Sequence, residues 1–325
     1  MKRHKITLSS ADGDICDVSY YTWRPKKISG WIHIIHGMSE HAARYENLGR
    51  YLQSNGYFVS ASDNRGHGQT GLNSNNANHL GDHKSWDLLI NDQKQLLIKL
   101  KQETRLHPLI IGHSMGALLA LNLSQECYPT DKLIPSGLVL SGVTCSPSLL
   151  YRLGEMIAFF EKLRLGRRSS SKLLNYLSFK SFNRALGATR TEADWISRDP
   201  SVVDIYISDP LCGQPLTTQS WFDFFAAASK LFKPVALKKL KSELPIYLIA
   251  GDQDPVSRFG RDIHALFKKL SSAGLCDVYT KIYVGGRHEM FNEINQNEVY
   301  LDLLKWIKYC EEKEKKICHP KRSLH

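Results

Sequence analysis

Short apolar runs alternate with longer amphipathic stretches along much of the chain. The short runs are rich in β-branched and aromatic residues, as expected of strands buried in a sheet. The longer stretches place apolar residues three or four positions apart, which predicts helices with one buried face. The predicted strands cover residues 31–35, 57–62, 109–111 and 137–140, and the predicted helices between them cover residues 42–55, 86–100 and 115–127. This alternation predicts βαβ units, and therefore an α/β fold with a mostly parallel central sheet flanked by helices.

The alternation stops near residue 146 and resumes near residue 231. The intervening stretch contains short amphipathic segments rich in Leu, Phe and basic residues, without a strand–helix rhythm. After it come predicted strands at 246–250 and 279–284 and predicted helices at 258–270 and 295–310. We therefore expect one core in two parts, residues 1–145 and 231–310, interrupted by a mostly helical insertion at 146–230.

The two ends of the chain carry different patterns. Residues 5–8 and 16–23 flank a turn-forming Ala-Asp-Gly-Asp sequence, which predicts an antiparallel hairpin at one edge of the sheet. Residues 311–325 alternate in charge and contain a proline, so we expect a charged, flexible tail.

Composition places the chain among ordinary globular proteins. Of its 325 residues, 42% are hydrophobic and 23% are charged, which excludes disordered, collagen-like and coiled-coil chains. The basic start is followed by a stretch too short and too polar for a signal peptide, and we therefore expect a cytoplasmic protein. The seven cysteines are widely spaced and form no CxxC pair, so neither a disulfide framework nor a metal site is expected.

The formal net charge is +11, and its basic residues concentrate at 164–168, 233–241 and 313–322. None of these clusters belongs to a nucleic-acid-binding motif, so no nucleic-acid partner is expected. A solvated surface is the simplest interpretation of the charge. The alternative is a weak, peripheral association with an anionic membrane surface at its inner face.

The chemistry starts from the sequence Gly112-His113-Ser114-Met115-Gly116. It follows a predicted strand and opens a predicted helix, which is the context of a G-x-S-x-G nucleophile elbow. The serine must adopt a strained backbone conformation, and a side chain at either glycine would collide with the neighbouring backbone. The start of the helix adds free N–H groups near a developing oxyanion.

A serine nucleophile needs a base, and the base needs an orienting carboxylate. In this topology both follow the serine in the chain, each just after a later strand. Asp252 and Asp254 follow the strand that ends at residue 250, and His288 follows the strand that ends at residue 284. We favour Asp254 as the acid because it is better placed to reach the imidazole, while Asp252 can brace the turn.

Other histidines lie near the predicted elbow, but they precede or adjoin the serine. His36, His67 and His113 are therefore in the wrong order for the base, which leaves His288. The oxyanion of the tetrahedral intermediate needs two N–H donors. We expect these from Met115, which follows the nucleophile, and from Met38, in the loop after the strand 31–35.

These motifs together resemble one enzyme family. Residues 36–45 (HGMSEHAARY), 63–68 (DNRGHG), 112–116 (GHSMG) and 251–255 (GDQDP) resemble the monoacylglycerol lipase and lysophospholipase branch of the α/β-hydrolase superfamily, with a serine aminopeptidase S33-type domain. Residues 285–293 (GGRHEMFNE) are similar to its bacterial members. The resemblance covers residues 5–310 and is weakest in the insertion, which would correspond to the family's cap. It implies that Arg65 has a structural role, held by a carboxylate such as Asp92.

The resemblance implies a catalytic triad of Ser114, Asp254 and His288, with Met38 and Met115 in the oxyanion hole. It implies ester hydrolysis through an acyl-enzyme, without metal or organic cofactor, on a lipid ester such as a monoacylglycerol or a lysophospholipid. Aromatic residues of the insertion are expected to line an acyl-chain site or to form the core of the insertion itself. Those we expect to bind substrate are Phe159, Trp221 and Phe225.

Two alternatives stay open on the sequence. An aminopeptidase of the proline iminopeptidase type shares this fold and triad, but it needs acidic residues in the cap to hold the substrate's free amine. A ligand-binding protein without catalysis is a second possibility, although no triad member is missing here. The acidic residues available for the first alternative are Glu192, Asp194, Asp199, Asp204 and Asp209.

Overall fold

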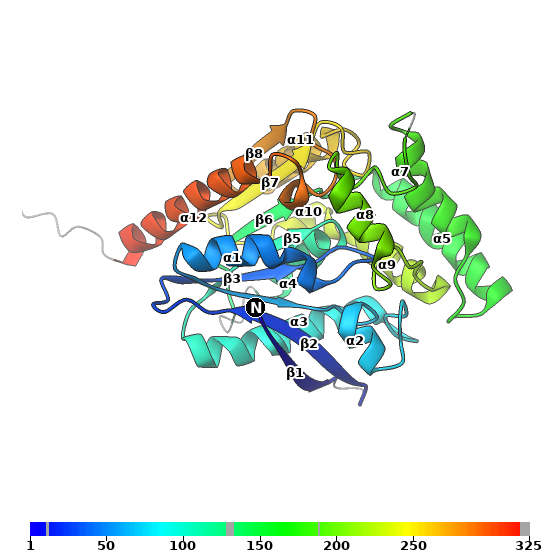
Figure 1. The fold of residues 1–325 in the computed structure, drawn as a ribbon, viewed down its shortest axis with the longest axis horizontal. Coiled ribbons are helices and arrows are strands. Elements are labelled where there is room, and N and C mark those ends of the chain that lie inside the picture. The colour runs from blue at the N-terminus through cyan, green and yellow to red at the C-terminus, as the bar shows by residue number, and fades with distance from the viewer. Residues whose placement is uncertain (11–12, 128–132, 188, 319–325) are drawn as a thin grey trace, which may run out of the picture.

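A computed structural model describes residues 1–318 except 11–12, 128–132 and 188, and side chains up to residue 313. It contains one eight-stranded sheet in the order β1-β2-β4-β3-β5-β6-β7-β8 (Figure 1). β1 and β2 form an antiparallel hairpin and β2 pairs antiparallel with β4, while the other neighbours are parallel. The strands are β1 Lys2–Ser9, β2 Ile15–Trp23, β3 Gly30–Ile35, β4 Tyr57–Ser62, β5 Pro108–His113, β6 Gly137–Ser141, β7 Ile246–Gly251 and β8 Val278–Tyr283. The predicted α/β fold is confirmed.

Helices cover both faces of the sheet because its central strands are apolar on both sides. Every residue of β4, β5, β6 and β7 is buried. α1 (Glu46–Ser54) and α12 (Gln296–Cys318) cover one face, and α3 (Ser85–Thr104), α4 (Met115–Cys127) and α11 (Arg261–Ser272) cover the other. The remaining short elements of this part are η1 Ala42–Tyr45, α2 Gly68–Asn73, α10 Pro234–Leu237 and η3 Met290–Asn292.

Between β6 and α10, the described residues form helices joined by loops and no strand, apart from an isolated bridge between Ser170 and Thr217. These helices gather at one end of the sheet, at the right in Figure 1. We call this group the cap helices. They are α5 Ser148–Leu165, α6 Lys172–Asn175, the π-helix η2 Tyr176–Lys180, α7 Ser181–Arg184, α8 Pro200–Ser208 and α9 Thr218–Leu231.

Several helix boundaries differ from those expected, among them the end of α3, which continues to Thr104 instead of residue 100. α11 begins three residues later than expected, because Arg258, Phe259 and Gly260 all have positive φ and cannot belong to a right-handed helix. α12 continues to Cys318, so residues 311–318 are helical rather than a frayed tail. The Glu and Lys residues of this stretch are good helix formers, and Lys313 bonds to Asp277 of the core. Residues 319–325 of the predicted tail lie outside the described residues.

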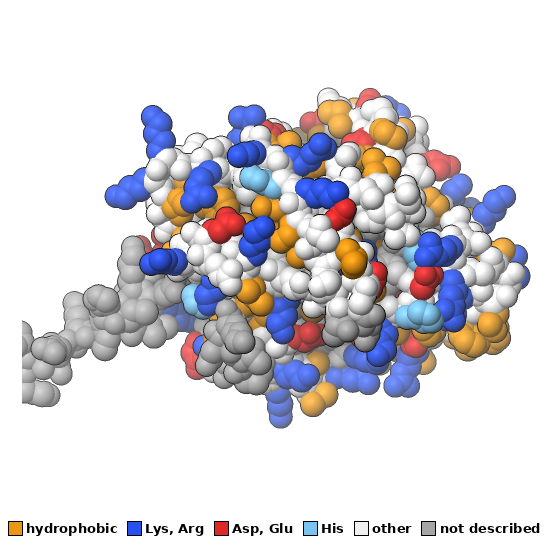
Figure 2. Space-filling view, turned by 90° about the horizontal axis from the view of Figure 1, so that it is seen from below, with side chains coloured by type: hydrophobic (Ala, Val, Ile, Leu, Met, Phe, Trp, Pro, Cys, Tyr) orange, Lys and Arg blue, Asp and Glu red, His pale blue; other side chains and the backbone are white. Residues whose placement is uncertain are grey.

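Basic side chains outnumber acidic ones on the face of the molecule seen from below. Figure 2 shows many Lys and Arg side chains and fewer Asp and Glu side chains on this face, in agreement with the net charge of +11. Among the helices that the structure describes, none is both long enough and apolar enough to cross a membrane.

Candidate active site

Ser114 occupies the sharp turn between β5 and α4. Its φ is +52°, in the left-handed region that is strained for a residue with a side chain. The turn is held by the Ser114 N–H, which donates to the Ser141 carbonyl at 2.8 Å. A Cβ atom on Gly112 would lie 2.3 Å from the Gly116 carbonyl oxygen, and one on Gly116 would lie 2.1 Å from the Ile35 carbonyl oxygen. Both positions therefore require glycine, as the nucleophile-elbow prediction supposes.

Asp254 and His288 meet in the loops that follow β7 and β8. Asp254 Oδ1 lies 3.0 Å from His288 Nδ1 and also accepts the Val256 N–H at 2.9 Å. Both side chains are buried. Asp252 does not reach the imidazole; its Oδ1 accepts the Gly285 N–H at 2.7 Å and so joins the two loops. The structure thus places Asp254, the favoured carboxylate, against His288.

The four histidines considered for the base differ in their electrostatic surroundings. Burial by itself would lower the pKa of His288, but the charge and hydrogen bond of Asp254 raise it above its ordinary value. Burial lowers the pKa of His67 and of His113 to about 4, and it lowers the pKa of His36 as well. His288 is therefore the one of the four whose environment stabilises an imidazolium ion.

Ser114 and His288 line the same cavity, which has a volume of about 420 Å³. The Ser114 hydroxyl makes no hydrogen bond to the residues that the structure describes, so it is free to meet a ligand. Serine–histidine contacts are often long in unoccupied active sites and shorten when substrate binds. Met38 and Met115 also line the cavity. Met115 begins α4, so its N–H has no acceptor within the helix.

A buried ion-pair chain joins the loop after β3 to the residue after His288. Arg44 donates to Glu40 at 2.9 Å and to both carboxylate oxygens of Glu289 at 2.6 and 2.7 Å. Glu40 also accepts the Gly37 N–H at 2.6 Å, which fixes the backbone just before Met38. Burial opposes ionisation of Glu40, but Arg44 holds its pKa below the ordinary value. Nothing in the sequence signalled this chain except the four-residue spacing of Glu40 and Arg44.

The His288 ring is enclosed by two residues that sequence analysis did not select. Gly142 has a φ of +59°, and a Cβ atom there would lie 2.8 Å from Cε1 of His288. The Trp195 ring lies 5.2 Å from the His288 ring, centroid to centroid, and the Trp195 carbonyl accepts the His288 N–H at 3.3 Å. The segment between α7 and α8 therefore forms part of the wall around the imidazole.

The cavity wall is largely apolar, and most of it comes from the cap helices. Trp221 and Phe225 line it, as expected, but Phe159 does not. Phe159 is two residues beyond Ile157, which faces the cavity, so the helical period turns Phe159 away. Its side chain is 40% exposed and contacts Phe222 on the outside. The apolar residues of the cap helices that line the cavity are Leu150, Tyr151, Leu153, Ile157, Leu174, Leu177, Phe179, Phe182, Tyr206, Trp221, Phe224 and Phe225.

The five acidic residues considered for an aminopeptidase do not line this cavity. Four of them bond to basic or polar partners elsewhere: Glu192 to Lys180, Asp194 to Thr191, Asp204 to Arg190 and Asp209 to His41. The fifth, Asp199, caps the start of α8. Glu40 and Glu289 do line the cavity, but Arg44 is bonded to both.

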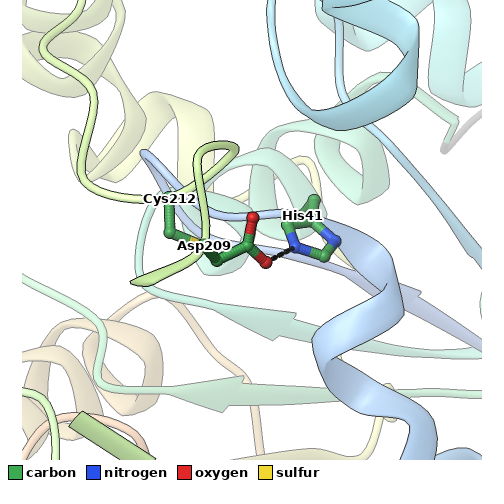
Figure 3. Close-up of side chains that lie close together, drawn as sticks. All are labelled: His41, Asp209 and Cys212. Atoms are coloured by element: carbon green, nitrogen blue, oxygen red, sulfur yellow. Dashed lines mark hydrogen bonds and ion pairs between the residues drawn. The ribbon is translucent and has the colours of Figure 1, made fainter. Parts of the chain in front are cut away.

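The predicted support of Arg65 is confirmed, and a separate hydrogen bond joins the loop after α8 to the core. Arg65 donates to both carboxylate oxygens of Asp92, at 2.8 and 3.1 Å. His41 Nε2 lies 2.8 Å from Asp209 Oδ2, with Cys212 beside them (Figure 3). Of the described residues, these three form the one group that could offer three metal ligands. Burial raises the pKa of the Cys212 thiol, and the His41 ring and the Asp209 carboxylate are hydrogen-bonded to each other.

Several known proteins are similar to this chain in sequence and in fold. The family model for serine aminopeptidase S33 matches residues 26–295. A monoacylglycerol lipase of Mycolicibacterium smegmatis is 27% identical, covering 89% of this chain and 92% of that protein. A human monoglyceride lipase is 28% identical, covering 92% and 89%. A carboxyl esterase from Bacillus coagulans superposes with a TM-score of 0.84 at 26% identity, covering 95% of this chain and 99% of that one.

Proposed function

Because the chain belongs to the serine aminopeptidase S33 family and is an ester hydrolase with an α/β-hydrolase fold, we propose that it cleaves esters of apolar acyl chains through an acyl-enzyme on Ser114. One observation carries the proposal. Ser114, on a strained elbow, shares an apolar cavity with His288, whose imidazole is hydrogen-bonded to the buried Asp254.

The proposed reaction begins when His288 accepts the Ser114 proton as the hydroxyl oxygen attacks the ester carbonyl carbon. Asp254 holds the Nδ1–H tautomer, so that Nε2 faces the serine, and stabilises the imidazolium that forms. The protonated imidazole then gives its proton to the departing alcohol. Water, deprotonated by the same histidine, attacks the acyl-enzyme and releases the acid together with free Ser114.

The N–H groups of Met38 and Met115 are the proposed oxyanion donors. Met115 supports this role because it begins α4, where the helix dipole adds a partial positive charge. Met38 follows Gly37, whose own N–H is held by Glu40. The loop that would carry the second donor is thereby fixed before substrate arrives.

The apolar cap wall supports an acyl chain as the group that fills the cavity. Monoacylglycerols and lysophospholipids have such a chain next to a polar alcohol, so they are the proposed substrates. An aminopeptidase is less well supported, because the acidic residues of the insertion lie away from the cavity and Arg44 neutralises those inside it. The test is hydrolysis of monoacylglycerols, lysophosphatidylcholine and short- and long-chain nitrophenyl esters, beside a proline naphthylamide. Cleavage of the naphthylamide alone would overturn the lipid assignment.

Truncating a residue of the cavity wall should impair long substrates selectively. Phe225→Ala is expected to lower kcat/KM for long-chain esters by about tenfold relative to short-chain esters, because part of the acyl chain loses an apolar contact. Phe159→Ala is the matched control, since this phenylalanine of the cap helices lies outside the cavity. The measurement is the ratio of long- to short-chain kcat/KM. If Phe225→Ala and Phe159→Ala have the same ratio of long- to short-chain kcat/KM, the acyl chain does not contact Phe225.

The raised pKa of His288 sets the expected pH dependence. The base must be neutral, so kcat/KM should rise with pH around a midpoint above 6.5, the ordinary histidine value. Folding stability should depend on pH in the opposite direction, because the His288–Asp254 ion pair stabilises the folded chain only while the imidazole is protonated. The contribution of this ion pair to folding is complete below pH 6.5 and is lost as pH rises through the raised pKa. A pH profile of short-ester hydrolysis, with thermal unfolding followed in the same buffers, tests both; a midpoint below 6.5 would contradict the first.

We also propose that the chain associates peripherally with anionic membrane surfaces. The net charge of +11 and the basic face in Figure 2 support this. Long-chain monoacylglycerols and lysophospholipids partition into membranes, so such an association would bring the enzyme to its substrate.

A further inference from the structure

Three side chains of different chemistry meet where the turn after α8 contacts the loop after β3 (Figure 3). Their donor atoms are His41 Nε2, Asp209 Oδ2 and Cys212 Sγ, and all three lie within 4.8 Å of one another. Imidazole nitrogen, carboxylate oxygen and thiolate sulfur are the ligand types that Zn²⁺ takes from proteins. No cysteine motif signals this group in the sequence, because His41 lies 168 positions before Asp209.

Two of the three donors belong to one tight turn. The Cys212 N–H donates to the Asp209 carbonyl at 3.0 Å, which closes a four-residue turn. Asp209 Oδ1 accepts the Leu211 N–H at 2.8 Å, so the turn itself orients the carboxylate and leaves Oδ2 to face His41. Metal-binding carboxylates are typically oriented by a further hydrogen bond of this kind. The turn therefore presents a carboxylate oxygen and a sulfur atom toward the same imidazole.

Hydrogen bonds beside the group hold His41 opposite this turn. The Gly213 N–H donates to the Ser39 carbonyl at 2.9 Å, and the Ser39 hydroxyl donates to the Gln214 carbonyl at 2.7 Å. The Tyr206 hydroxyl also donates to the Ser39 carbonyl, at 3.2 Å. Ser39 is two residues before His41, so these bonds fix the backbone on both sides of the group. A metal ion would find its three donors already assembled, without ordering a loop to bind.

The group is shielded but can be reached from solvent. His41 and Cys212 are buried, whereas the Asp209 side chain is 25% exposed, so an ion can enter beside the carboxylate. The hydrogen bond between His41 and Asp209 is 2.8 Å long. Nitrogen and oxygen ligands of one tetrahedral Zn²⁺ lie about 3.3 Å apart, so these two side chains need to separate by only about 0.5 Å. None of the three side chains lines the cavity that contains Ser114.

We propose that His41, Asp209 and Cys212 bind one Zn²⁺ ion, with water as the fourth ligand. The ion replaces the hydrogen bond between His41 and Asp209, and the imidazole coordinates in its neutral form with the proton on Nδ1. Burial raises the pKa of the Cys212 thiol, but a coordinating Zn²⁺ removes the thiol proton, which passes to solvent. Ca²⁺ and Mg²⁺ fit less well, because they prefer oxygen ligands. The zinc ties the turn after α8 to the loop that carries Met38, and it takes no part in ester cleavage.

The experiment measures zinc binding by the whole chain, without an affinity tag and after removal of metals with a chelator. Titration calorimetry gives the stoichiometry and the affinity. Co²⁺ serves as a spectroscopic substitute for Zn²⁺, because a thiolate ligand adds a sulfur-to-cobalt charge-transfer band. The test variants are Cys212→Ser and Asp209→Asn. The matched control is Cys276→Ser, which removes an exposed thiol two residues before β8.

Wild type and Cys276→Ser are expected to bind one Zn²⁺ per chain and to show the charge-transfer band with Co²⁺. Cys212→Ser should lose the band and bind zinc at least about 100-fold more weakly, while Asp209→Asn should keep the band and bind roughly tenfold more weakly. Zinc should raise the midpoint of thermal unfolding of wild type and of the control, but not that of Cys212→Ser.

Two results would overturn the zinc site: equal zinc affinity in wild type and Cys212→Ser, or no charge-transfer band in wild type. Thermal unfolding without zinc shows whether each variant is folded, and the wild-type band decides the proposal even if Cys212→Ser does not fold. Hydrolysis of a short nitrophenyl ester by the zinc-free chain tests the proposed function separately. A chain that binds zinc in this way but cleaves no ester would keep the zinc site and reject the proposed function.

Discussion

Replacing Ser114 by alanine is expected to lower kcat for ester hydrolysis by about 10⁶-fold. The variant removes the only atom that the proposed mechanism uses to form the acyl-enzyme. The backbone of the elbow should tolerate the change, because its N–H bond to Ser141 and the close approach of Gly116 to β3 involve no atom of the serine side chain.

A fluorophosphonate probe provides the second measurement, since it reacts with an activated serine whatever the substrate. Wild type should be labelled and Ser114→Ala should not. The control is Ser124→Ala, on the same helix α4, whose hydroxyl bonds to the Ala120 carbonyl and lies away from the cavity. It should retain activity within about twofold. Labelling that persists without Ser114 would place the nucleophile elsewhere, whereas no labelling of wild type would favour a ligand-binding protein.

The elbow and the two later loops could be predicted because their chemistry is local. Gly112 and Gly116 flank Ser114 in a five-residue motif, and the collisions that demand glycine involve backbone fixed by the strand–turn–helix context. The loops bearing Asp254 and His288 follow segments that could be identified as strands: residues 246–250 form an apolar run, and residues 279–284 are rich in β-branched and aromatic residues. Parallel strands end at the same edge of a sheet, so their order in the chain was sufficient to bring these side chains together.

The surroundings of His288, in contrast, depend on contacts between residues far apart in the chain, which no local sequence pattern encodes. Trp195 reaches His288 from 93 positions away in the chain, through a segment without strand–helix rhythm. Glu289 is next to the base in sequence, yet its partner Arg44 lies near the other end of the chain. The role of Gly142 has no local signal either, since its close approach to the His288 imidazole appears only when β6 and the last loop are assembled.

The orientation of the cap helices was also hidden from the sequence. α5 is apolar on more than one side, with Ile157 in the cavity and Phe159 and Phe160 outside it. An amphipathic pattern identifies the core-facing side of a helix only when the other side is polar. The exposed apolar side of α5 therefore made Phe159 look equivalent to Phe225.

Asp254→Asn is expected to lower kcat by about 10⁴-fold, because an amide at this position favours the wrong imidazole tautomer and cannot stabilise the imidazolium. The matched control is Asp252→Asn in the same loop. Asp252 accepts the Gly285 N–H through Oδ1, and an asparagine oxygen can accept the same bond, so activity should fall by no more than a few fold. Comparable losses in both variants would show that the loop, rather than one carboxylate, is responsible.

The pH profile separates this electrostatic role from a merely structural one. In wild type the charge of Asp254 outweighs the effect of burial and raises the pKa of His288. Without that charge, burial becomes the larger influence, so the pKa of His288 should fall and the remaining activity should reach its plateau at lower pH than in wild type. Asp252→Asn should leave the midpoint unchanged. A residual activity with an unshifted midpoint would mean that Asp254 orients the ring without stabilising its charge, and the acid would then have to be sought among Glu40 and Glu289, the other carboxylates near His288.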